Sequence, residues 1–303
     1  MGRKTLRARF FHPPQSLAGC FTSFYLLEVD LPEGRFLTDA LHPEWGNLRF
    51  FQGALPETRR PDGAMLKETP FTATGPSAHP TAFRLPKTRM WGIGLLPLGW
   101  AKFIEVPASE LADSVSDGMQ HPAFIRFRAL QHALENAEAE SEEAQAEIIC
   151  DHFLALDRPL RDKARICAVH EALIDPEVRS PAQLASQSAM TPRTLERMCA
   201  RYFGFPPQLL IRRQRMMRTL AAFMLAEKTT WSQVIDLHYT DHAHFTREFH
   251  AFMCMSPSEY AAMEHPVLGA FMAERERQWG SPVQTLDAPQ GPGTSADSPK
   301  SGL

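Results

Sequence analysis

The spacing of hydrophobic and polar positions changes partway along this 303-residue chain. In the N-terminal part, short apolar or alternating runs are separated by Pro, Gly, Asn and Asp, which is typical of strands joined by turns. These runs occupy residues 20–31, 47–55, 81–86 and 89–103. They predict a β-rich domain, a sandwich or a barrel, over residues 1–130. The three glycines of GIGLLPLGW after Trp91 are expected to serve turns.

After the β-rich domain, the hydrophobic and polar positions have the spacing of helices. Residues 124–157 contain no Gly or Pro, and all charges between positions 135 and 151 are acidic. We expect an acidic helical linker over residues 131–160, with the acids on a solvated helix face and a partner surface as the alternative. A further helix is expected at 266–280, and the Pro-, Gly- and Ser-rich composition of residues 281–303 predicts disorder. The predicted fold class is α+β with two domains, the second all-α.

The second domain contains an internal sequence repeat. TPRTLERMCARYFGFPP, beginning at Thr191, is matched fifty residues later by DHAHFTREFHAFMCMSP, beginning at Asp241. Each copy follows a short helix and a tight turn, and Thr191 and Asp241 can both cap a helix. Helix, turn and capped helix form a helix-turn-helix unit, so the sequence predicts two such units. The other matched pairs are Leu195 and Phe245, Arg197 and Arg247, Tyr202 and Phe252, and Pro207 and Pro257.

Each copy has an apolar stripe and an opposite polar face. Arginine can donate two hydrogen bonds to guanine and glutamate can accept one from cytosine, so these faces suit the reading of base edges in DNA. The connecting segment 207–226 spans about 30 Å as a helix, close to one turn of B-DNA at about 34 Å. The outward residues are Arg193, Glu196, Arg197 and Arg201 in the first copy, and His242, Ala243, Thr246, Arg247 and His250 in the second. Contacts to the DNA backbone are expected from Thr191, Arg201, Arg212, Arg213, Arg215, Thr246 and His250.

With these motifs, residues 161–265 resemble the DNA-binding domain of the AraC/XylS family of bacterial transcriptional regulators. The resemblance implies a β-rich N-terminal domain that senses or oligomerises, and a regulator that usually activates transcription. It also implies base-reading roles for Arg193, Glu196 and Arg197 in the first unit and for His242, Ala243, His244 and Arg247 in the second. The family usually has glycines where this chain has His238 and Cys254, so the first unit is expected to carry more of the sequence reading.

Four histidines crowd this second unit: His238, His242, His244 and His250. A zinc site is the alternative, but a turn at residues 240–241 separates the first pair, and residues two apart on a helix point in different directions. No Cys pair or HExxH motif accompanies them. We therefore predict no metal, no cofactor and no catalytic residue.

The N-terminal domain leaves two alternatives open. One is an enzyme or a metal-binding cupin-like domain fused to the DNA-binding module, although His42 and His79 are isolated from each other along the chain. The other is an effector pocket lined by aromatic residues, for which a plain β core is the simpler interpretation. The aromatic residues in question are Trp45, Phe50, Phe51, Phe83, Trp91, Trp100 and Phe103.

The composition restricts the expected location and partners of the protein. The net charge is −3, yet residues 193–218 carry seven arginines against one glutamate, so a neutral total hides a basic region. Five scattered cysteines without a CxxC pair favour reduced thiols and a cytoplasmic location. No signal peptide or membrane partner is expected. The expected partner is double-stranded promoter DNA, and the further candidates are RNA polymerase, a small-molecule effector and a second copy of the chain.

Overall fold

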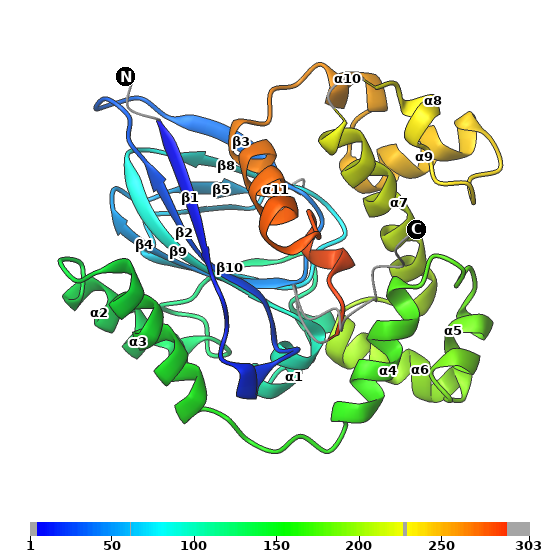
Figure 1. Ribbon diagram of the computed structural model, residues 1–303, viewed down its shortest axis with the longest axis horizontal. Coiled ribbons are helices and arrows are strands. Elements are labelled where there is room, and N and C mark those ends of the chain that lie inside the picture. The colour runs from blue at the N-terminus through cyan, green and yellow to red at the C-terminus, as the bar shows by residue number, and fades with distance from the viewer. Residues whose placement is uncertain (1–4, 61, 227–228, 290–303) are drawn as a thin grey trace, which may run out of the picture.

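The structure, a computed structural model, describes residues 5–60, 62–226 and 229–289. A β-rich part precedes a helical part, which confirms the α+β class (Figure 1). The strands are β1 (Leu6–Phe11), β2 (Phe21–Val29), β3 (Leu37–Leu41), β4 (Gly46–Gly53), β5 (Glu57–Arg59), β6 (Met65–Lys67), β7 (Phe71–Thr74), β8 (Thr81–Leu85), β9 (Thr88–Leu95) and β10 (Val115–Asp117).

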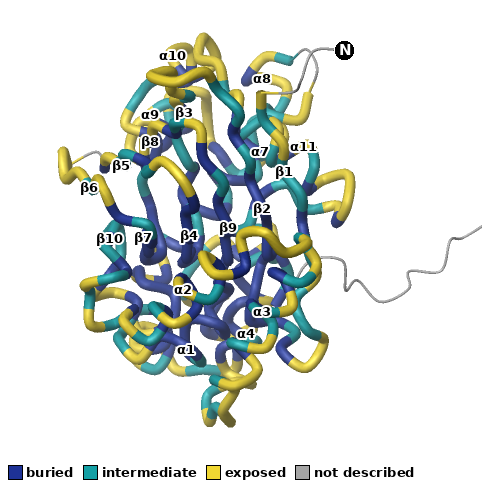
Figure 2. The backbone as a smooth tube through the Cα atoms, turned by 90° about the vertical axis from the view of Figure 1, so that its left-hand side faces the viewer, coloured by how far each residue is buried: buried dark blue, intermediate teal, exposed yellow. Residues whose placement is uncertain are grey.

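Within the described residues these strands form a six-stranded sheet, in the order β1-β2-β9-β4-β7-β10, and a four-stranded sheet, β3-β8-β5-β6. Their facing sides enclose an apolar interior, to which Tyr25 and Leu27 of β2 contribute from one sheet and Phe83 from the other. Phe24 and Leu26 alternate with them and belong to a different cluster on the outer face. Because both faces of β2 are covered, its sequence is almost continuously apolar. Figure 2 shows these central strands buried along their length.

Three helices cover the outer face of the larger sheet: α1 (Pro97–Phe103), α2 (Arg128–Asn136) and α3 (Glu142–Ala155). Phe153 of α3 packs against Phe24 and Phe103, with ring centroids 6.1 and 4.9 Å away. Segment 131–160 is therefore not a linker, because its apolar residues belong to the β-domain core. One of its acids also has a partner there, since Glu142 accepts hydrogen bonds from Arg7 and Arg9 of β1.

Only the first half of the apolar run at residues 89–103 is a strand. β9 ends at Leu95, and α1 begins at Pro97, where a missing N–H costs nothing at the first helical position. The first glycine of this run does not form a turn. A Cβ at Gly92 would lie 1.9 Å from the Tyr25 ring, so glycine allows this ring to lie directly over β9.

The helical part continues the same core. One apolar cluster runs from Trp91 and Phe103 in the β-domain to Leu195 and Phe245 in the helices. The two domains are therefore packed together through buried apolar surface, which restricts their relative motion. The helices are α4 (Lys163–Ile174), α5 (Pro181–Gln187), α6 (Pro192–Met198), a π-helical turn (Cys199–Phe203), α7 (Pro207–Leu225), α8 (Trp231–Val234), α9 (His242–Met253), α10 (Pro257–Ala261) and α11 (Pro266–Trp279). Among the described residues, no helix is long and apolar enough to cross a membrane.

The start of the predicted disordered tail is ordered. Residues 284–286 form a 3-10 turn, and Thr285 and Asp287 are buried. The Gln214 side chain of α7 donates to the Thr285 carbonyl at 2.6 Å, so a polar contact to another element holds this segment despite its composition. The expectation of disorder is wrong for residues 281–289, and residues 290–303 lie outside the described part.

The two positions where glycine was expected behave differently. Cys254 ends α9 in the left-handed conformation, with φ 59° and ψ 18°. His238 is not among the described non-glycine residues with positive φ, and its Nδ1 lies 2.8 Å from Asp236 Oδ1. Only the cysteine therefore carries backbone strain.

We predict that Cys254→Gly stabilises the full chain by about 1 kcal/mol, because glycine adopts positive φ without a Cβ clash. His238→Gly is the matched control and should destabilise it, since it removes the contact to Asp236 and relieves no strain. Urea unfolding followed by circular dichroism measures both. A Cys254→Gly variant no more stable than the parent would contradict the account of this helix end.

Candidate nucleic-acid interface

The first helix-turn-helix unit is built by α5 and α6. Ser180 Oγ accepts from the Gln183 N–H and Thr191 Oγ1 from the Thr194 N–H, each at 3.2 Å, and a proline follows each cap. The predicted cap at Thr191 is therefore confirmed, and Ser180 caps α5 in the same way. Ala189, in the turn between the helices, adopts a φ of 53°, which turns the chain sharply into α6.

The exposed face of α6 is the predicted one. Leu195, Met198 and Tyr202 are buried, which fixes the rotation of the helix against the core. The opposite residues, Arg193, Glu196, Arg197 and Arg201, are all exposed. Within the described residues, no ion pair engages Arg193 or Arg197, so both guanidinium groups are available to a ligand.

The second unit is less regular. α8 has only four residues, and Asp241 Oδ1 caps α9 by accepting from the His244 N–H at 2.6 Å. Phe245, Phe249 and Phe252 form the predicted buried stripe of α9. Outside it, His242, Ala243, Arg247 and His250 are exposed, whereas His244 and Thr246 are half-buried.

The histidines of this unit do not converge. The His244 ring packs edge-on against Tyr239, with centroids 5.2 Å apart, and its Nδ1 lies 3.2 Å from Thr240 Oγ1. Of the predicted backbone-contacting residues, the Thr246 hydroxyl donates to the His242 carbonyl at 2.9 Å. Across the described residues, no group of three or more His, Cys, Asp or Glu side chains is arranged to hold a metal ion. His244 thus braces the turn before α9.

The connector α7 differs most from expectation. Glu248 of α9 is almost fully buried, and it accepts hydrogen bonds from Arg212 at 2.9 Å and Arg215 at 2.8 Å. The Tyr239 hydroxyl donates to the same carboxylate at 2.9 Å. Arg218 pairs with Asp236 at 2.8 Å. These arginines fasten the second unit to α7 instead of forming a free row for phosphates.

Arg213 does not fit its expected role at the DNA backbone, because its side chain is fully buried in this structure. Its guanidinium lies over the Trp45 ring, 4.0 Å from the centroid, and Nη1 donates to the Ser77 carbonyl at 3.0 Å. Burial lowers the pKa of this group to about 9. Nε and Nη2 have no hydrogen-bond partner in the part of the chain that the structure describes. The connector helix is thus anchored to the β-domain through an arginine.

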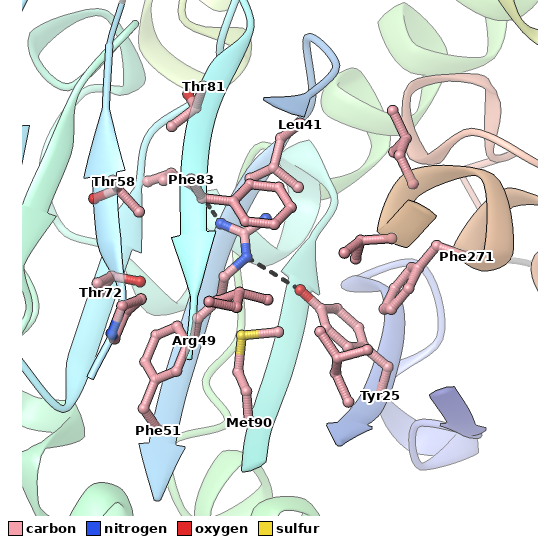
Figure 3. A pocket seen from close by; sticks show the side chains of 16 residues that line it. Tyr25, Leu41, Arg49, Phe51, Thr58, Thr72, Thr81, Phe83, Met90 and Phe271 are labelled. Carbon is pink, nitrogen blue, oxygen red and sulfur yellow. Dashed lines mark hydrogen bonds between the residues drawn. The ribbon is translucent and has the colours of Figure 1, made fainter. Parts of the chain in front are cut away.

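The interior of the β-domain holds a second candidate site, a small cavity of about 60 Å³ (Figure 3). Its walls are mostly apolar, but Arg49 enters it and donates to Tyr25 Oη at 3.2 Å and to Glu44 Oε1 at 2.6 Å. Burial would lower the pKa of Arg49, but the Glu44 charge outweighs it and the pKa is raised. The one charged side chain that lines the cavity is therefore paired with a carboxylate, Glu44, that does not line it.

The seven aromatic residues proposed as pocket walls separate into two groups. Only Phe51 and Phe83 line this cavity. The other five belong elsewhere in the core, with Trp45 lying under Arg213. The two histidines of the cupin alternative contact the helical domain, since His42 Nε2 lies 2.6 Å from Tyr260 Oη and His79 Nδ1 lies 3.3 Å from the Phe252 carbonyl.

Sequence reasoning missed Glu248 and Arg49. Both are charged residues whose partners come from other elements, and no local spacing relates them. The one available signal was that Glu248 continues the buried side of α9, three residues after Phe245 and beside Phe249, where an acid needs a buried cation.

Together the two capped helices with solvent-facing arginines define a DNA-binding protein with two helix-turn-helix units. Residues 184–263 match a family model described as a helix-turn-helix domain. This match agrees with the resemblance of the C-terminal domain to the AraC/XylS family, and it supports a DNA-binding transcriptional regulator. The comparison with curated proteins gave no match.

Three solved structures are similar at low identity. ToxT from Vibrio cholerae O395 is 10% identical, with 85% of this chain and 97% of ToxT covered at a TM-score of 0.42. Unsaturated fatty acid bound ToxT from Vibrio cholerae strain SCE256 is 11% identical over 88% of this chain and 98% of that one, at 0.43. The AraC-like transcriptional activator CuxR is 14% identical over 77% and 92%, at 0.26. At these TM-scores the likenesses carry no conclusion about ligand or mechanism.

We predict that Arg213→Met leaves the salt dependence of DNA binding unchanged, because the buried guanidinium touches no phosphate. Arg201→Ala is the comparison on an exposed position, and it should reduce the slope of log K against log salt by about 1. Fluorescence anisotropy titrations of the full chain with duplex DNA between about 50 and 200 mM salt measure both slopes. A reduction of about 1 in Arg213→Met would show that Arg213 leaves the β-domain to reach DNA.

Proposed function

We propose that this regulator reads promoter DNA by inserting α6 and α9 into two successive major grooves. The observation that carries the proposal is the paired exposure of arginines at equivalent positions, Arg197 on α6 and Arg247 on α9. Each lies opposite a buried apolar stripe that orients its helix. Arginine at such a position recognises guanine through two hydrogen bonds.

The base-reading set is proposed from the exposed residues of the two helices. In the first unit it comprises Arg193, Glu196 and Arg197. In the second it comprises His242, Ala243 and Arg247, with His244 assigned to the turn. The first unit carries more positive charge on its exposed face and is free of backbone strain at its C-terminal glycine, so it contributes more of the specificity.

The separation of the two helices supports this arrangement. α7 has 19 residues, which corresponds to about 28 Å of helix, against about 34 Å for one turn of B-DNA. The phosphate contacts are proposed to come from Thr191, Arg201, Thr246 and His250 at the edges of the two faces. Arg212 remains partly exposed beside Glu248 and can add to them.

The N-terminal domain is proposed to control this activity through the interior cavity. Its apolar walls and single polar cluster match the usual composition of small-molecule sites. RNA polymerase and a second copy of the chain remain expectations of the family resemblance, as do activation and action in the cytoplasm.

We predict that Arg193→Ala and Arg197→Ala each weaken binding to the best site by roughly 1–3 kcal/mol and relax base preference at one position. Selection of binding sites from a random duplex pool, with the full chain and each variant, measures both effects. Arg84→Ala is the matched control, because it removes one exposed arginine from the β-domain. It should leave the selected motif and the affinity unchanged.

Two results would count against the proposal. One is an identical motif for the parent, Arg193→Ala and Arg197→Ala, which would exclude this face of α6 from base reading. The other is the absence of any duplex-DNA binding by the folded parent chain at low salt.

A further inference from the structure

A basic segment connects the two domains, directly before the first helix-turn-helix unit. Residues 158–165, RPLRDKAR, carry four basic side chains and one acidic one. They follow α3 and enter α4, and they precede the residues 184–263 that match the family model. All four basic side chains are exposed, and we refer to them together as the basic ridge: Arg158, Arg161, Lys163 and Arg165.

The backbone of this segment is held against both domains. The Tyr202 hydroxyl, in the π-helical turn after α6, donates to Asp162 Oδ2 at 2.9 Å. Leu160 packs against the apolar core that the two domains share. Arg158 Nε donates to the Lys102 carbonyl of α1 at 3.1 Å. The basic ridge therefore has a fixed position relative to α6, although its side chains are exposed.

The exposed arginines of α6 lead to the basic ridge. Arg193, Arg197 and Arg201 are four residues apart and exposed, so they lie along one side of the helix over about 12 Å. Arg201, at the end of this row, lines an open groove of about 480 Å³ together with Arg158. A second groove, of about 250 Å³, is lined by Arg158 and Lys163. The positive charge of α6 thus continues across these grooves onto the basic ridge.

The cations of the basic ridge are weakly paired. Within the described residues, no ion pair engages Arg161 or Lys163. Arg158 Nη1 lies 3.4 Å from Glu105 Oε1, and both side chains are exposed. Exposed pairs of this kind add little stability, so Arg158 can exchange Glu105 for a phosphate. Three of the four cations are therefore free to bind an anionic partner.

The arginines of α7 are engaged much more firmly. Arg215 donates to the nearly buried Glu248 at 2.8 Å, and Arg218 pairs with Asp236 at 2.8 Å. If these arginines turned to phosphates, a carboxylate with little access to water would lose its partner, which is costly. The basic ridge has no such restraint. Cations available to a DNA backbone thus lie before the first unit as well as on its exposed face.

The basic ridge lies on the side of the first unit that faces away from the second. Figure 1 shows α9 at the top of the helical part and the chain that enters α4 at its bottom. The hydrogen bond between Tyr202 and Asp162 places this chain beside the end of α6. With α6 in one major groove and α9 in the next, the basic ridge would meet DNA outside the pair of half-sites.

We propose that the basic ridge binds the sugar-phosphate backbone of the DNA that flanks the first half-site, on the side away from the second. This inference rests on the proposed function and extends its DNA contacts into the segment between the domains. Exposed Arg and Lys side chains bind phosphates without reading bases. The contact therefore adds affinity and salt dependence, and it adds no sequence preference.

The first experiment removes the two cations that form no ion pair, in the double variant Arg161→Gln/Lys163→Gln. Arg35→Gln/Arg59→Gln is the matched control, since it removes the same charge from exposed positions of the β-domain. Each full chain is titrated by fluorescence anisotropy with the selected duplex between about 50 and 200 mM salt. The ridge variant should select the parent's motif and bind it on the order of tenfold more weakly at about 100 mM salt, with a slope of log K against log salt reduced by about 2. The control should match the parent.

The second experiment locates the contact on the DNA. Duplexes are shortened from either end toward the pair of half-sites, and the first half-site is the one whose base preference relaxes in Arg193→Ala. Parent affinity should fall when the duplex beside the first half-site is shortened by about five base pairs, half a helical turn. The ridge variant should bind the long and the shortened duplex equally, because the flanking contact is already lost.

Equal slopes and equal dependence on the flanking DNA in the parent and the folded ridge variant would overturn the ridge contact and leave the base-reading proposal intact. An equal loss in the control would assign the effect to net charge and would overturn the contact as well. If the double variant does not fold, Arg158→Gln should reduce the slope by about 1, and an unchanged slope would count against the ridge in the same way. A parent chain that binds no duplex DNA would overturn the proposed function together with this inference.

Discussion

The arrangement of both helix-turn-helix units depends on the burial of α7 against the β-domain. Arg213 is central to this contact, because its guanidinium lies on Trp45 and donates to the Ser77 carbonyl, while no carboxylate among the described residues forms an ion pair with it. A buried cation of this kind is costly unless its surroundings stay in place. Separation of the domains would expose the Trp45 contact and the apolar cluster around it. The β-domain therefore sets the orientation of the helix from which both units extend.

The arginines of α7 lie on different faces of this helix and contact different elements. Arg213 points into the β-domain, while Arg212 and Arg215 converge on the buried Glu248 of α9. One face thus fixes α7 to the β-domain, and the other fixes α9 to α7. These arginines act as positioning contacts between elements, so the phosphate contacts are proposed to come from residues at the edges of the two exposed faces. The paired units consequently move as a linked body, which suits a fixed spacing between two half-sites.

The sequence was informative wherever a local rule decided the structure. The cap at Thr191 located α6, the fifty-residue repeat located α9, and a 3.6-residue period identified which side of each helix is buried. It was uninformative where a partner came from a distant element. Neither Arg213 over Trp45 nor Asp39 capping α11 has a signature in nearby residues. Composition misassigned residues 131–160 and 281–289 for the same reason, because acidic or Pro-rich segments are ordered when other elements receive them.

The central claim is that two helices from one chain read two grooves on one side of the duplex. Hydroxyl-radical footprinting of the full chain on its selected site measures this directly. The account predicts two protected patches on the same face of the DNA, separated by about one helical turn of 10–10.5 base pairs, with methylation of guanines in both grooves interfering with binding. A single protected patch, or two patches on opposite faces, would contradict it.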